Sequence, residues 1–426
     1  MSQPPAAPSS APHPASGLAR WQILATHMLA VALLQGTANA VLAMLAVIAQ
    51  KEFAATKLQV VIITSSSTVF FVLAIFWNGL FARSRLDRYL LLYWAVYCLP
   101  LAFAGLVPNI WALIALQLVS CVGVAAYHPP AGDLLRSLYP DSQRGRVYSF
   151  VWGGWMISGA LFGFAMGQWL TRDAHAFRYY MPIAAGLQLL GVLLLMWLGR
   201  ATGHTQARDA TVDRVRWSLR DAFEPITHMR EVLKADPVFA KYEAAYMTYG
   251  VGWMIAYALV PILVVDKLNL NYEQIAKSTQ VAYQIAIVAA ALPFGWLMDR
   301  IGAIRNCAIS FAMLTFYPLA LIFTASEHHL LLASIWFGLA HAGASVGWML
   351  GPVSLAPSRD KVAQYVGIHA TLVGVRGAIF QAAGVGLYSL THSFTWPLLI
   401  AAGAYVWSAW QMWTLDREML AKKSRG

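Results

Sequence analysis

The stretch Gly295-Trp-Leu-Met-Asp299-Arg300-Ile-Gly302-Ala-Ile-Arg305 is short, charged and bounded by glycines, and it lies between two long apolar runs. Each run is near the length of about 20 residues that crosses the hydrocarbon core of a bilayer. A chain that leaves a membrane and re-enters it within a few residues needs a tight turn, for which glycine supplies the backbone freedom. Asp299 and Arg300 then lie at the water interface. The stretch therefore predicts a loop between two membrane-spanning helices.

The composition of the whole chain agrees with a membrane protein. Of the 426 residues, 59% are hydrophobic and 12% are charged, and the mean hydropathy is +0.57, whereas soluble domains contain about 25% charged residues. The fold class predicted is an all-α polytopic membrane protein in a lipid bilayer. The net charge of +11 reflects basic cytoplasmic loops, so no nucleic acid is expected as a partner. The three cysteines lie in or beside apolar runs and predict neither a disulfide nor a metal site, and no cofactor is expected.

Twelve apolar runs predict twelve transmembrane helices, six on each side of a long polar linker. The predicted spans are residues 20–49, 57–82, 88–107, 110–138, 146–170, 178–199, 238–265, 274–298, 303–325, 329–356, 362–387 and 395–415. The predicted organisation is a disordered cytoplasmic tail (1–18), an N-terminal six-helix bundle (19–199), a cytoplasmic linker with a short surface helix near 215–233 (200–237), a C-terminal six-helix bundle (238–415) and a cytoplasmic tail (416–426). No signal peptide is expected, because the first apolar run is too long for one.

The distribution of charge predicts both orientation and helix arrangement. Most of the 30 Lys and Arg residues fall in the tails, the linker and alternate loops, which predicts a multi-pass protein of the cytoplasmic membrane with both termini in the cytoplasm. A faint repeat pairs Leu138 with Leu355 and Pro140 with Pro357. Predicted spans 3, 6, 9 and 12 have no ionisable residue in their interiors, so we expect them to face lipid. Parallel six-helix repeats around a midplane solute site are a transporter architecture.

Polar and aromatic side chains at mid-depth are candidates for such a site. Many are spaced by four or seven residues, which places them on one face of a helix. The alternative for each is structural, as an interhelical hydrogen bond or as core packing. The substrate-binding candidates are Gln35, Asn39, His128, Trp152, Trp155, Tyr249, Trp253, Gln280, Gln284, His341, Trp348 and Arg376.

Arg376 is the strongest of these candidates, because it is a charged residue well inside predicted span 11. A charge at the bilayer centre costs about 2.5–3.5 kcal/mol on insertion scales, so the side chain should face water, a counter-charge or a ligand. Its guanidinium stays charged and presents a planar fork suited to carboxylate or phosphate. We expect an anionic solute there. The alternative is a permanent salt bridge, with Glu243 as the partner.

Three residues are candidates for coupling to protons. His128 and His369 have side chains whose charge changes near neutral pH, and Glu243 is a candidate acid, with an interfacial pair with Lys241 as the alternative. Two prolines after His128 predict a kink in span 4. His128 and Asp133 also fit the His-x4-Asp spacing of certain acyltransferases, but a kinked membrane helix is the wrong setting for that chemistry. No enzyme activity is expected.

The loop at 295–305 closely resembles the signature of the major facilitator superfamily: glycine, an apolar pair, Asp-Arg, glycine and a basic residue. The resemblance implies two bundles that rock about a midplane site. It also implies a cytoplasmic gate in which Asp299 is braced by a basic residue at the start of span 5. The copy in the first half has Arg83 where the acid is expected, so we hypothesise an inverted pair of Arg83 with Asp360. Asp133 is expected to pair with a loop arginine. The gate candidates are Arg83, Asp133, Arg144, Arg146, Gly295, Asp299, Arg300, Gly302 and Asp360.

Two features depart from the family pattern. Val119 occupies the place of the usual span-4 arginine, which argues against a standard proton antiport. The ladder Gly159, Gly163 and Gly167 resembles a glycine-rich antiporter motif, but Ala160 replaces its proline, so we expect helix packing there. The segment around His128 resembles span 4 of exporter-like members of the fosmidomycin-resistance type.

The function expected from the resemblance is secondary active transport of a small organic solute, powered by a proton gradient. Arg376 favours an anionic solute. A proton-driven drug or metabolite efflux pump is the alternative. A metal-ion transporter that uses His128, His341 and His369 is a third and weaker hypothesis. We expect a monomer whose partners are its small-molecule substrate, protons and the lipid bilayer.

Overall fold

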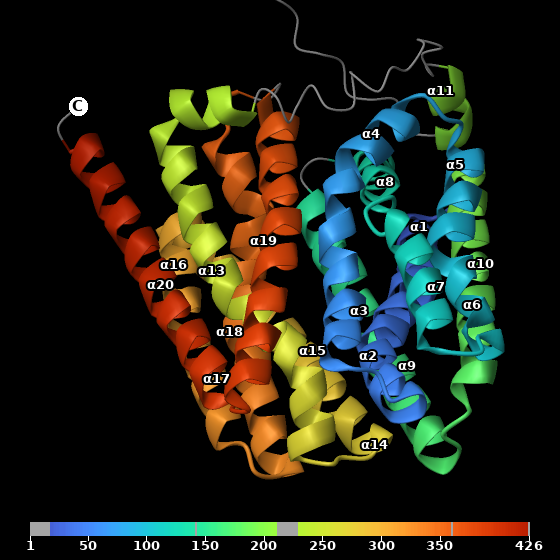
Figure 1. Ribbon diagram of the computed structural model, residues 1–426. Helices are drawn as coiled ribbons and strands as arrows, with labels where there is room; N and C mark the ends of the chain where they lie inside the picture. The colour runs from blue at the N-terminus through green and yellow to red at the C-terminus, as the bar shows by residue number, and fades with distance from the viewer. Residues whose placement is uncertain (1–17, 141–142, 211–228, 359–360, 425–426) are drawn as a thin grey trace, which may run out of the picture.

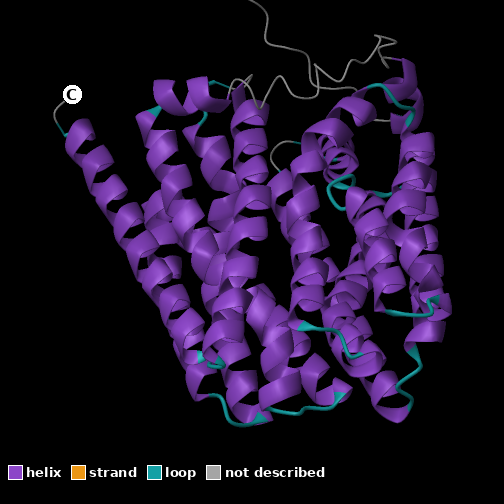
Figure 2. Cartoon of the chain, in the orientation of Figure 1, coloured by secondary structure: helices purple, strands orange, loops and turns teal. Residues whose placement is uncertain are grey.

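The computed structural model describes residues 18–140, 143–210, 229–358 and 361–424. Every regular element in these ranges is a helix (Figures 1 and 2). The N-terminal half comprises α1 (Arg20–Val31), η1 (Ala32–Gly36), α2 (Thr37–Phe53), α3 (Lys57–Val69), η2 (Phe70–Leu73), α4 (Ala74–Ala82), α5 (Leu86–Tyr93), η3 (Trp94–Cys98), α6 (Leu99–Ala102), η4 (Phe103–Leu106), α7 (Ile110–Val122), α8 (His128–Leu138), α9 (Arg144–Arg172), α10 (Phe177–Ala201) and α11 (His204–Ala210).

The C-terminal half comprises α13 (Pro237–Ile262), η5 (Leu263–Lys267), α14 (Tyr272–Ile275), η6 (Ala276–Val281), α15 (Ala282–Ile301), α16 (Ala303–Leu314), α17 (Phe316–Phe323), α18 (Glu327–Leu355), α19 (Val362–Thr391) and α20 (Thr395–Lys423). Residues 1–17 and most of the predicted linker helix lie outside the described ranges.

The helices have the length and composition of membrane spans. Within the described ranges, nine continuous helices are long and apolar enough to cross a membrane, and a tenth crossing is a pair, Lys57–Leu73 and Phe76–Ala82, bent by 49°. The other two predicted spans correspond to α7 followed by α8, and to α20, which continues past the predicted end at residue 415. The predicted all-α polytopic fold is confirmed.

Predicted span 4 is two helices rather than one kinked helix. α7 ends at Val122, residues 123–127 form turns, and α8 begins at His128. Pro129 and Pro130 occupy the first helical positions of α8, where a missing N–H loses no intrahelical bond. The prolines therefore start a helix instead of kinking one. The Trp77 indole N–H donates to the Val122 carbonyl at 2.6 Å and holds the end of α7 in place.

The two halves lie side by side, and their outermost helices are α10 and α20 (Figure 1). Between the halves, α3 packs on α19, and α9 packs on α14, η6 and α15. The glycine ladder makes the second contact possible: a Cβ at Gly163 would lie 2.1 Å from Gln280 Oε1, and one at Gly167 would lie 2.6 Å from the Ala276 Cβ. The ladder therefore packs helices together, as expected.

The two ends of the molecule differ. We call the end where α10 stops and α13 starts the linker end (top of Figure 1) and the opposite end the hairpin end. Hydrogen bonds and ion pairs join described residues of the two halves at the hairpin end and at mid-depth. These contacts are Gln50–Pro261, Lys51–Leu270, Glu52–Tyr272, Lys57–Asp266, Thr68–Gln381, Gln168–Glu273 and Thr171–Glu273. The halves are thus fastened together at the hairpin end.

Candidate solute and proton site

Arg376 lies in a seam between α13 and α19 and is 2% exposed. Its Nη1 donates to the Tyr246 carbonyl at 2.7 Å, while its Nε is buried with no partner. The Tyr249 ring lies 5.8 Å from the guanidinium carbon. A Cβ at Gly250 would lie 2.2 Å from Arg376 Cδ, so the glycine makes room for the side chain. The arginine is therefore buried with one donor satisfied and another available.

Glu243, the partner of Arg376 in the alternative interpretation, is bound to His369 instead, and the described residues show no Arg376–Glu243 salt bridge. His369 Nδ1 lies 2.8 and 2.9 Å from the two Glu243 carboxylate oxygens, and both side chains are almost fully buried. The second ring nitrogen, His369 Nε2, is buried without a partner. Two of the predicted proton-coupling residues thus form one hydrogen-bonded pair, which becomes an ion pair when the imidazole carries a second proton. We call the shared face that carries Glu243, His369 and Arg376 the α13–α19 seam.

Trp348 and Tyr246 pack against the imidazole of the Glu243–His369 pair. The ring of Trp348 on α18 lies 5.3 Å from that of His369, and the ring of Tyr246 lies 4.9 Å from it on another side. The Tyr246 hydroxyl donates to the Ala344 carbonyl at 2.9 Å. These contacts hold the imidazole between α13 and α18 in surroundings with little water, where an electrostatic interaction is stronger than in bulk solvent.

His341 lies in a separate aromatic cluster on α13, α15 and α18. Its Nδ1 and the Tyr283 hydroxyl are 2.9 Å apart, and the rings of Phe337 and Trp253 stack on it at 5.0 and 5.9 Å. Tyr249 does not join Trp253 in one wall, as the spacing had suggested. It packs into the core of the C-terminal half, where its ring stacks on Phe311 of α16 at 4.6 Å.

The N-terminal half contributes fewer polar groups than expected. Gln35 Nε2 donates to the Tyr93 hydroxyl at 2.9 Å, which matches the alternative interpretation as an interhelical hydrogen bond. His128 is exposed at the first turn of α8, with its ring edge against Phe71 at 5.2 Å. Trp152 and Trp155 of α9 are partly exposed and pack beside residues of α15.

The three amides at the contact between the halves are grouped around the glycine ladder. Gln284 Oε1 and Asn39 Nδ2 both approach the position that a Cβ would occupy at Gly159, at 2.6 and 3.3 Å. The Gln280 side chain occupies the space that the absence of a side chain at Gly163 leaves on α9. The amide atoms of Gln280, and Oε1 of Gln284, are buried with no partner. The predicted binding residues are therefore spread over the seam, the aromatic cluster, the α9–α15 contact and the start of α8.

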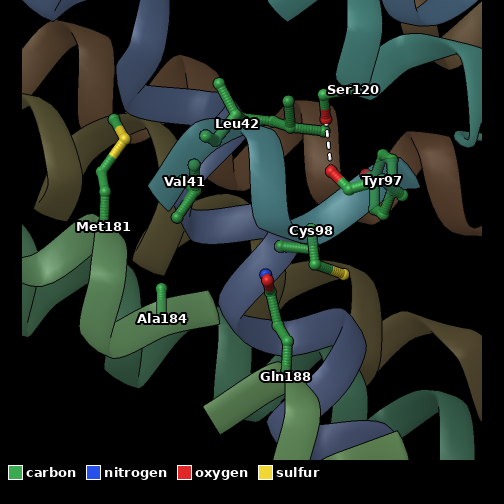
Figure 3. A pocket seen from close by; sticks show the side chains of 10 residues that line it. Val41, Leu42, Tyr97, Cys98, Ser120, Met181, Ala184 and Gln188 are labelled. Carbon is green, nitrogen blue, oxygen red and sulfur yellow. Dashed lines mark hydrogen bonds between the residues drawn. The ribbon is translucent and has the colours of Figure 1, made fainter. Parts of the chain in front are cut away.

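A small pocket lies apart from all of these residues. It is enclosed by α2, η3, α6, α7 and α10 of the N-terminal half, and Figure 3 shows the Gln188 side chain pointing into it between Val41 and Cys98. The Ser120 hydroxyl donates to the Tyr97 carbonyl at its edge. None of the predicted site residues lines this pocket.

Asp299, the central residue of the predicted gate at the linker end, is not engaged with the described basic residues of that gate. Asp299 and Arg146 are exposed, and neither forms an ion pair or hydrogen bond in the described part of the chain. Arg144 Nε donates to the Tyr139 carbonyl at 3.1 Å, and the Arg300 guanidinium lies 3.6 Å above the Trp296 ring. The predicted Asp299 contact with the start of α9 is therefore absent in this conformation.

The remaining gate candidates have local roles. Gly302 has φ +82° between α15 and α16, which is the tight turn expected from the sequence, whereas a Cβ at Gly295 would meet open space. Arg83 Nη1 donates to the Gly79 carbonyl at 3.4 Å. Asp133 Oδ2 lies 2.9 Å from His204 Nε2 of α11. Asp360 lies outside the described residues.

Sequence reasoning missed the contacts that close the hairpin end. Lys57 pairs with Asp266, and Tyr272 donates to Glu52 at 2.7 Å. The only available signal was the presence of charges beside short loops, and the same charges also serve to set orientation. A further missed contact joins the start of α13 to α19, where the Tyr365 hydroxyl donates to Asp236 Oδ2 at 2.9 Å.

Two helical halves that are joined at one end, with a Glu243–His369 pair and an arginine buried between long apolar helices, have the architecture of a polytopic membrane protein. The chain belongs to the Major Facilitator Superfamily, whose family model matches residues 28–380. This confirms the resemblance seen in the loop signature. It is an MFS transporter with membrane-spanning helices.

Individual relatives are distant. The chain is 25% identical to a gallate transporter of Pseudomonas putida over 69% of this chain and 70% of the relative. It is 22% identical to multidrug resistance protein MdtH of Baumannia cicadellinicola subsp. Homalodisca coagulata, over 70% and 67% of the two chains. A peptide transporter POT in complex with sulfate shares the fold, with a TM-score of 0.74, 12% identity, and 94% and 99% coverage. A mutant of nucleoside transporter NupG has a TM-score of 0.69, 14% identity, and 92% and 99% coverage.

Proposed function

We propose that this transporter carries a small organic anion by alternating access, together with protons. In the proposal it works as a monomer in the cytoplasmic membrane, with both termini and the linker end in the cytoplasm. Asp299 with Arg144 or Arg146, and Arg83 with Asp360, close the linker end when the hairpin end opens.

The observation that carries the proposal is the state of Arg376. A buried guanidinium with an unpartnered Nε is costly to maintain, because an unsatisfied buried donor costs about 1–3 kcal/mol. A solute carboxylate can bind Nε and Nη of one arginine in a bidentate fashion. In this conformation the Tyr246 carbonyl occupies Nη1, and we take it as the group that the solute displaces.

The Glu243–His369 pair supports proton coupling. With a neutral imidazole, the pair carries one negative charge and balances Arg376. Protonation of the pair leaves the positive charge of Arg376 unbalanced, and an arriving anion restores neutrality. Binding of a proton and of an anion at the seam therefore favour each other. The similarity to a gallate transporter agrees with this solute class, since gallate is a carboxylate.

Efflux of a drug or metabolite remains the second candidate. It is favoured by the similarity to MdtH and by the aromatic cluster around His341, which suits a flat apolar solute. The metal hypothesis has less support, because His341 and His369 are engaged with Tyr283 and Glu243. In addition, the described residues contain no group of three metal-binding side chains.

Uptake into proteoliposomes under an imposed pH gradient tests the proposal. A panel of labelled organic carboxylates is compared with neutral amides of the same shape, using wild-type protein and Arg376→Gln. We expect gradient-driven uptake of one or more carboxylates and a loss of about 10- to 100-fold in apparent affinity for the variant, the equivalent of one charged hydrogen bond. Equal uptake of the amides, or an unchanged variant, would contradict the anionic solute and favour the efflux alternative.

A further inference from the structure

The outer face of α20 is an apolar stripe that ends in a tryptophan and an arginine. α20 is the outermost helix of the C-terminal half (Figure 1), and its inner face packs on α13, α16 and α17. Exposed residues on the outer face follow one another at intervals of three or four, which is one side of a helix. They include Gly403, Val406, Trp410, Trp413 and Arg417. Arg417 therefore continues the surface that faces lipid.

The stripe changes from apolar to cationic at the depth of the lipid headgroups. α20 begins at Thr395, and about 20 residues of helix cross the hydrocarbon core. The crossing thus ends close to Trp413, which is 41% exposed, and Arg417 lies one turn beyond it. Tryptophan is enriched at the boundary between the core and the headgroups. The guanidinium of Arg417 is therefore level with the phosphates of the lipids around it.

Two guanidinium groups lie near the Trp413 ring. The Cζ of Arg417 is 5.6 Å from the ring centroid, and that of Arg305, at the start of α16, is 6.0 Å from it. At such distances a cation is attracted to the face of an indole. Arg305 also donates from Nε and Nη2 to Asp416 Oδ2 at 2.8 and 2.7 Å. These contacts fix the position of the ring and concentrate positive charge around it.

The two acids beside Arg417 in the sequence are bound to other cations. Asp416 pairs with Arg305, and Glu418 Oε2 lies 2.5 Å from Lys241 Nζ of α13. Both acids thus turn toward the inner neighbours of α20. Within the part of the chain that the structure describes, no carboxylate forms an ion pair with Arg417. Its exposed guanidinium is an uncompensated positive charge on the lipid-facing side of the helix.

We propose that Arg417 and Trp413, with Arg305 beside them, bind the headgroup of an anionic phospholipid. The planar guanidinium fork of Arg417 matches two oxygens of the lipid phosphate, and the indole packs below it on the glycerol and the first part of the acyl chains. A zwitterionic lipid carries its own ammonium group beside the phosphate, whereas an anionic lipid leaves the phosphate free for the arginine. Basic residues at the end of a membrane helix attract anionic lipids for this reason. The site is independent of the α13–α19 seam.

Quenching by brominated lipids measures which lipid lies next to Trp413. Purified protein is reconstituted in phosphatidylcholine vesicles in which the same minor fraction is either brominated phosphatidylglycerol or brominated phosphatidylcholine. The Trp413 contribution is the difference between the emission of the wild type and that of Trp413→Phe. We expect stronger quenching by the brominated phosphatidylglycerol, equivalent to about a fivefold preference for the anionic lipid, the contribution of one arginine at the surface.

Variants of Arg417 test whether its charge causes the preference. Arg417→Gln should abolish the preference, and Arg417→Lys should keep part of it, because the charge remains but the fork is lost. Arg172→Gln, which changes an exposed arginine at the hairpin end of α9, is the matched control and should behave as the wild type. The emission maximum of the Trp413 contribution without brominated lipid checks that the indole stays at the membrane surface in each variant.

Trp396, which is exposed at the opposite end of α20, separates a local site from a general attraction of anionic lipid by the net charge of +11. Its contribution, obtained with Trp396→Phe, should show no preference. An equal preference at Trp396 and Trp413 would overturn the site, as would equal quenching of Trp413 by the two lipids. A preference that persists in Arg417→Gln, or is lost completely in Arg417→Lys, would also contradict the role given to the charge of Arg417. None of these results depends on the transported solute.

Discussion

Two features of α13 accommodate the Arg376 side chain: the Tyr246 carbonyl accepts a hydrogen bond from it, and Gly250 leaves space beside it. Its Nη1 is bound by the Tyr246 carbonyl, and Gly250 leaves the space through which the aliphatic part of the arginine passes. Burial of an arginine with an incomplete set of partners lowers stability. The proposed binding role of Arg376 rests on this incomplete set of partners.

Gly250→Ala should displace Arg376 without removing its charge. The new Cβ would lie 2.2 Å from Arg376 Cδ, so the guanidinium must move. We expect transport of the anion to fall by about tenfold or more, because the loss of one hydrogen bond to a charged group costs about 1.5–3 kcal/mol. Uptake assays with purified, folded protein measure this. Gly367→Ala on α19, which meets open space, is the control. Equal activity of the two variants would show that the position of Arg376 is unimportant.

At the scale of elements, α9 packs very closely against η6 and α15, but several buried amide atoms in this contact have no hydrogen-bond partner. The notch at Gly163 admits Gln280, yet both amide atoms of Gln280 lack partners. Each unsatisfied buried group costs about 1–3 kcal/mol. The contact is therefore closely packed, and the unpartnered amide atoms offset part of the stability that this packing provides.

Gly163→Ala should force α9 and η6 apart. Because the added Cβ would lie 2.1 Å from Gln280 Oε1, overpacking of this kind should cost about 1–3 kcal/mol, seen as a lower melting temperature of the purified protein. Adding Gln280→Ala should restore most of the loss. Gly153→Ala on the same helix, where nothing lies within 4 Å, should be neutral. A Gly163→Ala variant as stable as this control would refute the account of the contact.

At the scale of the molecule, closure of the hairpin end depends on several individually weak contacts. Lys57 and Asp266 have side chains about one-third exposed, and ion pairs of this kind contribute about 0.2–1 kcal/mol. Their sum holds the halves together, but none is strong enough to lock them. In the proposed alternating access, opening of this end would therefore break only weak polar contacts.

Lys57→Glu should open the hairpin end more often. It places two acids beside each other, and a cysteine introduced at Thr68 on α3 should then react faster with an impermeant thiol reagent added from that side. The expected increase is about two- to fivefold, the range that such a pair supports. Combining Lys57→Glu with Asp266→Lys should return the rate toward that of the parent. Failure of the double variant to do so would show that the pair does not close this end.

The gate at the linker end is predicted to form only when the hairpin end opens. Cysteines placed at residues 146 and 299 should therefore cross-link slowly in the parent protein, where Arg146 and Asp299 are exposed and unpaired. Cross-linking should become faster in the Lys57→Glu background. The same rate in both backgrounds would contradict coupling between the two ends.

The sequence alone determined the helical class, the succession of spans, the turn at Gly302 and the packing role of the glycine ladder. These properties depend on local composition, on the length of apolar runs and on residues a few positions apart, all of which are visible along the chain. It also singled out Arg376, Glu243 and His369, because ionisable side chains at mid-depth are rare.

Only the tertiary structure decided how these residues pair. Glu243 is joined to His369 rather than to Arg376, and span 4 breaks between α7 and α8 where a single kinked helix was expected. Whether α13 and α19 bring two side chains together depends on their rotation and axial offset, which differ by single residues and leave no trace in periodicity. Which end of the molecule is fastened likewise depends on weak contacts between distant loops, each worth about 1 kcal/mol or less.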